Sequence, residues 1–398
     1  MIDLRAARND PDAVRAALAR RGAGEAFDEL LAADERWRAL VPRVDELRAR
    51  QKLDGKPSAE QLEELRRTKD ELKAAEDEIA TAEAARDAAL AKVPNLPHES
   101  TADGFQDEDA IVVKEWGERR SPEPPVEHLD IGNYDMERGA KVSGARFGFI
   151  IGDAARLSLA LYRLALDRLI EGGFTPVLPP VLVREEAMYG TGFFPSEKTD
   201  YYSVPEDGLY LVGTSEVPLI AMHMGEILEE LPIRYCAFSS CFRREAGAAG
   251  KDTRGMFRVH QFQKVEMVVY IRPEESWDEH ERLLALEEAL VHEVGLPYRV
   301  VNSAAGDLSS AAAKRYDIEA WFPSQERYRE ITSCSNTTDY QARRSGIRFR
   351  LGEKQLVTPH TLNGTAVTDR WALAILENFG GDVPLVLQQY GAPARVSK

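Results

Sequence analysis

Arginines, a carboxylate and an aromatic residue lie on two apolar runs near the middle of the chain. The first run ends in C-F-R-R-E at residues 241–245, and the second begins with R-V-H-Q-F at residues 258–262. The stretch between them is rich in glycine and basic residues, which predicts a β-hairpin with a flexible, positive loop. Arg243 can meet a phosphate, Glu245 an amino group, and Phe262 a flat ring. Together these groups are suited to holding a nucleoside triphosphate.

Residues 242–262 resemble motif 2 of the class II aminoacyl-tRNA synthetases, in particular that of the bacterial-type seryl-tRNA synthetases. They read F-R-R-E-A-G-A-A-G-K-D-T-R-G-M-F-R-V-H-Q-F. The resemblance implies that Arg243 binds the α-phosphate and the substrate carboxylate. It also implies that Glu245 accepts from the adenine amino group, that Phe262 stacks on the adenine, and that Arg258 meets the outer phosphates.

The activity implied by this resemblance is the activation of an amino acid by ATP. The attacking carboxylate is already ionised at pH 7, so the step needs no protein base. The protein must instead hold two anions together and stabilise a more anionic transition state. Arginine suits this task better than lysine because its planar fork matches carboxylate and phosphate oxygens.

A second stretch, residues 361–370 (T-L-N-G-T-A-V-T-D-R), is similar to the third motif of the family. Arg370 is expected to open a helix, where backbone N–H groups favour an anion, and the resemblance assigns it to the γ-phosphate. Arg243 and Arg370 are therefore the candidate catalytic residues. Asp369 stands where the family more often has a small or neutral residue. Its carboxylate either weakens phosphate binding or orients the arginine, and the sequence does not decide between these.

Residues 330–336 (E-I-T-S-C-S-N) are similar to a family strand whose glutamate and serine bind the magnesium ion that bridges the ATP phosphates. Here those residues are Glu330 and Ser333. Oxygen ligands, with the remaining positions left to water and phosphate, suit Mg²⁺. Because two residues three positions apart do not share one face of a regular strand, we expect a β-bulge between them.

Selectivity for serine needs polar groups, because a site built to bond a hydroxyl group rejects analogues that lack it. The resemblance implies that Thr214 and Glu266 hold the amino group and the hydroxyl of serine. Thr365 and the nearby Asn363 add further contacts, and Arg243 holds the carboxylate. A further stretch, Gly173 to Pro180, resembles motif 1, which builds the homodimer interface in the family.

The first part of the chain carries heptad repeats. Residues that are all apolar except Thr68 recur at alternating spacings of three and four at 30, 33, 37, 40, 44 and 47, and again at 65, 68, 72, 75, 79 and 82. The break at residues 54–57 (D-G-K-P) and a capping box of Ser58 and Gln61 separate two helices, which must pack antiparallel. The second helix, at about 1.5 Å per residue, would reach roughly 45 Å. Pro42 should kink the first helix, and Asp10 or Asn9 with Pro11 begins a short helix before it.

The composition changes near residues 93–97 (V-P-N-L-P), so we expect a helical, tRNA-binding arm at 1–98 and a catalytic domain at 99–398. In the second part we expect a helix at 153–171, an extended segment at 174–182 and a last helix at 371–378. Strands are expected at 209–212, 235–242, 257–266, 267–271, 298–301 and 327–333. This excess of strands predicts an α+β fold, an antiparallel sheet covered by helices, as in class II synthetases, preceded by a two-helix coiled-coil arm.

The composition sets limits on location and partners. No apolar run reaches the roughly 20 residues that span a bilayer, and the charged N-terminal residues differ from a signal peptide, so we expect a cytoplasmic protein without membrane contact. The three cysteines (236, 241 and 334) are expected to be buried and reduced. The net charge of −16 opposes nucleic-acid binding over the whole surface, although a local basic stripe can still bind RNA.

The resemblance covers nearly the whole chain and implies a seryl-tRNA synthetase. Such an enzyme uses ATP and Mg²⁺, forms seryl-adenylate, and transfers serine to tRNA(Ser) and also to tRNA(Sec). Three other readings stay open. They are a specialised copy serving an antibiotic pathway or inhibitor resistance, an amino acid:carrier-protein ligase, and a catalytically silent RNA-binding protein. The hairpin tip at 51–57 and the stretch at 129–135 look shorter than in relatives, which favours the first of these. The heptads oppose the second, and the motif arginines and carboxylates oppose the third.

Overall fold

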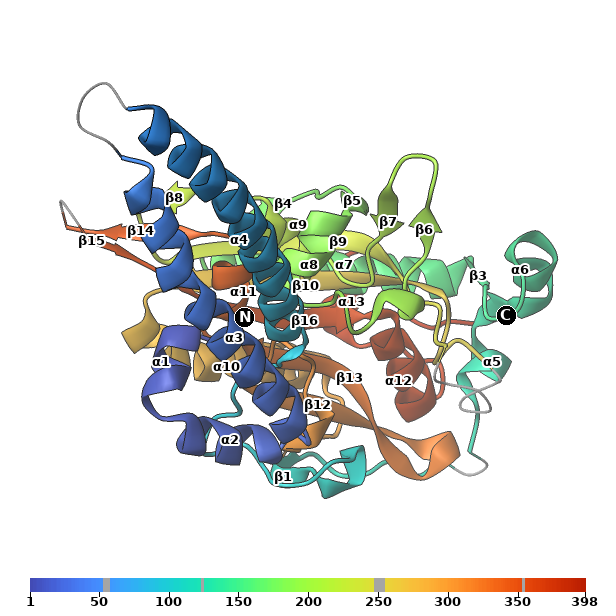
Figure 1. Ribbon diagram of the computed structural model, residues 1–398. Helices are drawn as coiled ribbons and strands as arrows, with labels where there is room; N and C mark the ends of the chain where they lie inside the picture. The colour runs from blue at the N-terminus through green and yellow to red at the C-terminus, as the bar shows by residue number, and fades with distance from the viewer. Residues whose placement is uncertain (53–57, 123–124, 247–254, 353–354) are drawn as a thin grey trace. The chain divides into compact units, whose positions relative to one another are not determined.

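The computed structural model describes residues 1–52, 58–122, 125–246, 255–352 and 355–398 (Figure 1). Its contacts divide the chain into two compact units, Met1–Leu96 and Pro97–Lys398. Most of the expected hairpin tip, at residues 53–57, and most of the basic motif loop, at residues 247–254, lie outside the described residues.

The first unit is helical and contains α1 Leu4–Asn9, α2 Pro11–Ala19, α3 Gly24–Arg50 and α4 Ala59–Lys92. Asp10 caps α2 by accepting a hydrogen bond from the N–H of Ala13, and Pro11 takes the first helical position, as predicted. The predicted capping box of Ser58 and Gln61 begins α4. α3 continues through Pro42 as one helix; the expected kink there stays a prediction.

Helices α3 and α4 pack against each other in opposite directions. Arg43 pairs with Glu78 at 3.2 Å and Arg48 pairs with Glu76 at 2.9 Å, so residue numbers rise along one helix as they fall along the other. The seam between them buries Val44, Leu47, Leu72 and Ala75. The predicted antiparallel coiled coil is confirmed. One seam position differs, because the buried residue is Asp34, bound by Arg8 at 2.5 and 2.7 Å, and its neighbour Ala33 is only half-buried.

The second unit is built on an eight-stranded sheet in the order β1-β11-β12-β13-β16-β10-β9-β4. All neighbouring pairs are antiparallel except β4 and β9. The strands are β1 Ile111–Trp116, β11 Tyr298–Asn302, β12 Lys314–Phe322, β13 Arg327–Asn336, β16 His360–Thr368, β10 Gln261–Ile271, β9 Ile233–Phe242 and β4 Thr175–Val177. The predicted α+β fold with an antiparallel sheet is confirmed.

Smaller elements surround this sheet. The helices are α5 His128–Ile131, α6 Met136–Ser143, α7 Asp153–Glu171, α8 Glu185–Thr191, α9 Glu216–Ala221, α10 Ser276–Val294, α11 Tyr340–Arg344, α12 Asp369–Phe379 and α13 Leu385–Gln388. Three small sheets contain β15 Gln355–Val357, β14 Arg348–Leu351 and β8 Ile227–Leu228; β2 Asn133–Asp135 and β3 Phe149–Ile151; and β5 Leu182–Arg184, β7 Leu209–Leu211 and β6 Ser203–Val204. None of the described helices is long and apolar enough to cross a membrane.

The two faces of the large sheet are covered differently. On one face, α7, α10 and α12 pack on alternate residues of β10, including Val265, Met267 and Val269, and form the main core. On the other face, α9 and α11 pack on Val268 and Tyr270, the next residues of the opposite alternation. This second cover reaches only part of the face. The stretch of β10 that carries Lys264 and Glu266 is not covered by these helices and lines a cavity.

Most of the expected elements appear within two residues of their predicted ends, and α7 matches at both ends. Two assignments are wrong. The strands expected at 257–266 and 267–271 are one strand, β10, which begins only at Gln261, because Phe257 and Val259 pack into the main core before the ladder starts. Helix α12 is not the last, since α13 follows it. The three cysteines are buried and free, as predicted.

Candidate active site

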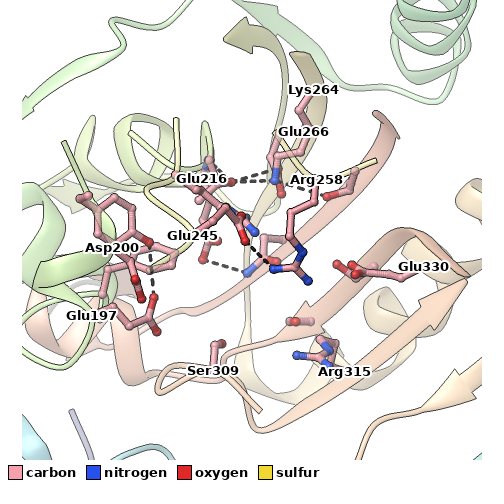
Figure 2. A pocket seen from close by; sticks show the side chains of 18 of the residues that line it. Glu197, Asp200, Glu216, Glu245, Arg258, Lys264, Glu266, Ser309, Arg315 and Glu330 are labelled. Carbon is pink, nitrogen blue, oxygen red and sulfur yellow. Dashed lines mark hydrogen bonds and ion pairs between the residues drawn. The ribbon is translucent and has the colours of Figure 1, made fainter. Parts of the chain in front are cut away.

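A cavity of about 490 Å³ lies over the uncovered part of the sheet (Figure 2). A hollow of about 110 Å³ adjoins it. The two share walls that include Arg243, Glu245, Arg258 and Glu330. All of the residues predicted from the sequence line one or both of these spaces: Thr214, Arg243, Glu245, Arg258, Phe262, Glu266, Glu330, Ser333, Asn363, Thr365 and Arg370. The structure therefore brings them together, while their individual roles remain predictions.

A β-bulge sets the direction of Glu330 and Ser333. Thr332 of β13 lies opposite Ile318 of β12, but Glu330 lies opposite Glu319, so Ile331 is an extra residue without a partner in the ladder. The extra residue shifts the alternation by one position, and Glu330 and Ser333 both reach the cavity. The predicted bulge is confirmed.

A second bulge does the same in β16. Val367 lies opposite Val265 of β10, whereas Thr365 lies opposite Glu266, which leaves Ala366 as the extra residue. As a result Thr365 and Thr368, three positions apart, both face the site beside β10. Neither motif would present its side chains in this way on a regular strand.

One end of the cavity, which we call the serine end, holds a buried polar network. Lys264 and Glu266 form an ion pair on β10. Thr214 donates to Glu266 at 3.1 Å, and the Lys264 ammonium donates to the hydroxyl of Thr214 at 2.8 Å and to that of Thr365 at 3.3 Å. All four side chains are buried. Burial raises the pKa of Glu266, while Lys264 and Thr214 lower it by favouring the charged form.

Glu216, at the start of α9, is a further carboxylate at this end that the sequence did not single out. Its Oε1 accepts from Gln341 at 2.6 Å and from Asn363 at 2.9 Å. Burial, together with the nearby Glu266, raises the pKa of Glu216 to about 7, although Gln341 and Lys264 act in the opposite direction. The serine end therefore contains two buried carboxylates, which is an arrangement suited to a cationic ammonium group.

The other end, which we call the nucleotide end, carries the guanidinium groups. Arg243 follows β9; its Nε donates to the carbonyl of Gly213 at 3.2 Å, and its guanidinium lies 5.4 Å from the centre of the Phe262 ring. Arg258 pairs with Glu245, whose backbone is left-handed (φ 53°). Figure 2 shows this pair between the serine end and Glu330.

Arg370, the second residue of α12, approaches from the far side of the smaller hollow. Its Nη1 donates to the backbone carbonyl of Glu330 at 2.9 Å and to its carboxylate at 3.1 Å, and its Nε donates to the carbonyl of Phe257 at 3.3 Å. The Glu330 side chain keeps half of its area exposed to the cavity. Burial among neighbouring groups raises its pKa, but Arg370, Arg315 and Arg243 more than offset this and hold the pKa of Glu330 below its ordinary value.

Other residues that line the cavity were not predicted from the sequence: Glu197, Asp200, Glu216, Lys264, Ser309, Arg315 and Ser335. Arg315 lies on β12, a strand that the sequence analysis did not identify, and donates to Asp307 at 2.7 Å and to Ser303 at 3.0 Å. Lys264 lies two residues after the end of the stretch at 242–262. Its position two residues before Glu266 on one strand was the available signal that it shares the same face.

Comparison with known proteins adds independent findings. Residues 201–379 match the model of the tRNA synthetase class II core domain (G, H, P, S and T), and residues 1–97 match that of the seryl-tRNA synthetase N-terminal domain. A serine–tRNA ligase of Thermobifida fusca is 50% identical over 394 residues, which cover 95% of this chain and 93% of the relative.

Two solved structures resemble the chain along its whole length. A seryl-tRNA synthetase of Pyrococcus horikoshii, complexed with ATP, has a TM-score of 0.92 and 39% identity, and covers 100% of this chain and 99% of its own. A cytoplasmic serine–tRNA ligase of Naegleria fowleri, in complex with AMP, has a TM-score of 0.87 and 34% identity, with coverages of 98% and 96%.

Proposed function

The chain belongs to the seryl-tRNA synthetase family, and on this premise we propose that the cavity over β9, β10, β13 and β16 carries out both steps of the family reaction. The activity is ATP-dependent ligation of serine to tRNA. Serine first reacts with ATP to give seryl-adenylate and pyrophosphate, and the seryl group then passes to the tRNA as AMP leaves. The observation that carries the assignment of the site is that Arg243, Arg258 and Arg370 line the cavity or its adjoining hollow, beside a buried group of hydroxyls and carboxylates.

In the first step the serine carboxylate attacks the α-phosphate. Arg243 lines both spaces, so its guanidinium is available to the carboxylate and to the α-phosphate together, and it stabilises the charge that builds up between them. Phe262 receives the adenine ring and Glu245 its amino group. Arg258 and Arg370 exchange their carboxylate partners for the outer phosphates, Arg370 for the γ-phosphate.

Serine is selected by the buried polar groups of the serine end, which exchange bonds within their network for bonds to the substrate. The Glu266 carboxylate and the Thr214 hydroxyl bind the ammonium and hydroxyl groups of serine, with Thr365 and Asn363 beside them. An amino acid without a hydroxyl group would leave these buried polar atoms without a partner, which is costly. Alanine is therefore rejected although it is smaller than serine.

The donor set of Glu330 and Ser333 fits Mg²⁺. Both supply oxygen atoms, both reach the cavity because of the Ile331 bulge, and the pKa of Glu330 lies below its ordinary value, so the carboxylate is charged at neutral pH. When bound, the ion would neutralise charge on the ATP phosphates. Before ATP binds, Arg370 pairs with the same carboxylate at 3.1 Å, and this pair is the one that the γ-phosphate would replace.

In the second step the 3′-terminal ribose of the tRNA attacks the carbonyl carbon of seryl-adenylate. We assign tRNA(Ser) binding to the arm at 1–98 and the chemistry to the domain at 99–398. The long pair of α3 and α4, and the match of residues 1–97 to the N-terminal domain of the family, support this division. tRNA(Sec) as a second substrate rests on the resemblance of the sequence. In the family, the arm of one subunit serves the active site of the other.

A homodimer is supported by an apolar surface on the second unit. Six large apolar side chains on or beside α6, β3, α7 and β4 are exposed: Val142, Phe149, Ile151, Leu159, Ile170 and Leu178. The most exposed, Leu178 at 87%, follows β4, which is one edge of the large sheet and lies in the stretch that resembles motif 1. Exposed apolar side chains on neighbouring elements such as these are typical of a protein interface. The cytoplasm as location stays a proposal from the sequence.

One experiment tests this function against its alternatives. Pyrophosphate exchange is measured with each amino acid, and charging of bulk tRNA is measured next. We expect exchange with serine alone, followed by charging. Exchange without charging would favour the carrier-protein ligase, and no exchange would favour a silent RNA-binding protein. Charging of only some serine isoacceptors would favour a specialised copy.

The structure also shows where to shorten the arm. Arg43 and Glu78 face each other across α3 and α4, so replacement of residues 44–77 by a short Gly-Ser linker shortens both helices at one level. We expect seryl-adenylate formation to persist and charging to be lost. Equal loss of both activities would contradict the assignment of the arm to tRNA binding.

A further inference from the structure

Asp369 is the residue directly before Arg370. Both of its carboxylate oxygens accept hydrogen bonds from groups other than the neighbouring guanidinium. Its Oδ2 accepts the backbone N–H of Gln263 at 2.8 Å, and its Oδ1 accepts the hydroxyl of Tyr162. Asp369 and Tyr162 are each only 5% exposed. The carboxylate therefore does not compete with phosphate for Arg370.

The hydrogen bond between the Gln263 N–H and Asp369 satisfies a backbone donor just beyond the end of the β10–β16 pairing. Pairing between β10 and β16 begins at Lys264 opposite Thr368, and Gln263 is the next residue of β10 beyond that pair. At this point β16 gives way to α12, so no strand residue is left to accept the N–H of Gln263. Asp369 supplies the acceptor. A buried N–H without an acceptor would be costly.

The three residues join elements that each carry part of the nucleotide end. Gln263 follows Phe262 on β10, Asp369 precedes Arg370 on α12, and Tyr162 lies on α7 in the core behind the sheet. A carboxylate at the first position of a helix also interacts favourably with the partial positive charge of the helix N-terminus. The contacts fix the start of α12 against β10, and with it the spacing between Phe262 and Arg370.

We propose that Asp369, held by Tyr162 and Gln263, is a positioning residue that sets the spacing between Arg370 and Phe262 for ATP. This rests on the proposed function of the cavity. It resolves the two alternatives left by the sequence in favour of orientation, and it acts on ATP without touching it. The serine end lies on other residues and should not depend on this contact.

The test compares Asp369→Ala with Asp369→Asn in pyrophosphate exchange. Alanine removes both contacts, so we expect the KM for ATP to rise about tenfold or more, while the KM for serine stays within about twofold. Asparagine can accept from Gln263 and donate to the Tyr162 oxygen, so it should restore most of the ATP affinity. Tyr162→Phe, which loses one contact, should fall between them.

Glu377 provides a matched control on the same helix. It is fully buried near the other end of α12, where it accepts from His128 at 2.8 Å and from Ser324 at 2.7 Å. We expect Glu377→Ala to lower stability without a selective change in the KM for ATP. An equal ATP defect in this variant, a normal KM for ATP in Asp369→Ala, or equal rises for ATP and serine would overturn the proposal.

Two further measurements keep the outcomes separate. If Asp369→Ala does not fold, Tyr162→Phe decides, because an unchanged KM for ATP in that variant would also overturn the proposal. ATP binding is also measured calorimetrically without serine. A parent protein that binds ATP but shows no exchange with serine would contradict the proposed function, while its ATP affinity relative to the variants would still test the role of Asp369.

Discussion

At the serine end of the cavity Thr214, Glu266 and Thr365 are 3%, 1% and 6% exposed, whereas at the nucleotide end Glu330 keeps half of its side chain exposed. The buried groups are bonded to one another through Lys264. The groups at the nucleotide end are partly exposed and form ion pairs that a phosphate could replace. On the proposed function, selectivity for a small substrate is built into the fold before the substrate arrives, while the nucleotide end takes its final pairing from the ligand.

Loss of one charge should therefore cost far more stability at the serine end. Glu266→Gln leaves the buried Lys264 without its carboxylate, and we expect a loss of about 3–5 kcal/mol in the free energy of unfolding. Glu245→Gln breaks the pair with Arg258, whose side chains are 28% and 15% exposed, and should cost less than the fully buried pair. Urea unfolding of both variants gives the comparison. Similar losses would mean that the two ends do not differ in this way.

Loss of a charge at the nucleotide end should instead act mainly on the rate of the reaction. Arg243→Ala should lower the rate of pyrophosphate exchange about 10²- to 10³-fold, or roughly 2–4 kcal/mol in transition-state energy, as for loss of one oxyanion donor. Arg244→Ala is the control, since its guanidinium donates to the Tyr201 carbonyl and lies over the Tyr202 ring. That variant should retain exchange within a few-fold. Near-normal exchange in Arg243→Ala would refute the phosphate assignment.

Two threonines on either side of the β16 bulge, Thr365 and Thr368, allow the two ends of the cavity to be tested separately on one strand. Thr365→Val removes a hydroxyl that accepts from Lys264, and we expect the KM for serine to rise about tenfold with little change for ATP. Thr368 instead donates to the Ile331 carbonyl at 3.0 Å and lines only the smaller hollow, so Thr368→Val should leave the KM for serine unchanged. Measured KM values for both substrates test this; a serine effect in both variants would speak against it.

The smallest expected effect is a pH dependence confined to the serine end. The pKa of Glu216 is raised to about 7, so its carboxyl group becomes neutral as the pH falls through 7 and loses its attraction for the serine ammonium. The KM for serine should rise a few-fold between pH 8 and pH 6, and the KM for ATP should change less. In Glu216→Gln the slope for serine should disappear. If the slope persists, another group is responsible.

The sequence predicted a set of residues that the structure brings to one cavity and its adjoining hollow, because each motif is a short stretch of recognisable residue types. It missed β12 and β16, since β12 is buried on both faces and shows no clear alternation, while β16 contains a glycine and a bulge. It also passed over Lys264 and Glu216, because isolated charges are usually solvated and only the packed sheet buries these two.

The role of Asp369 illustrates a limit of local reasoning. The sequence showed an unusual neighbour for Arg370 but left its effect undecided. The contact on which our proposal rests comes from Tyr162, which is 207 residues away in the chain and reaches Asp369 only after α7 packs against α12. No pattern near Asp369 could have indicated that contact.

The backbone carbonyl of Ile331, the extra residue in β13, also accepts hydrogen bonds from the start of α12. The Ile331 carbonyl accepts from the Thr368 hydroxyl at 3.0 Å and from the Trp371 indole at 3.3 Å, on either side of Arg370. An engineer who straightened the strand by deleting Ile331 would keep Glu330 and Ser333 on the same face, since both would then follow ordinary alternation. The deletion would instead affect the start of α12, because the Thr368 hydroxyl and the Trp371 indole would lose the carbonyl that accepts from both.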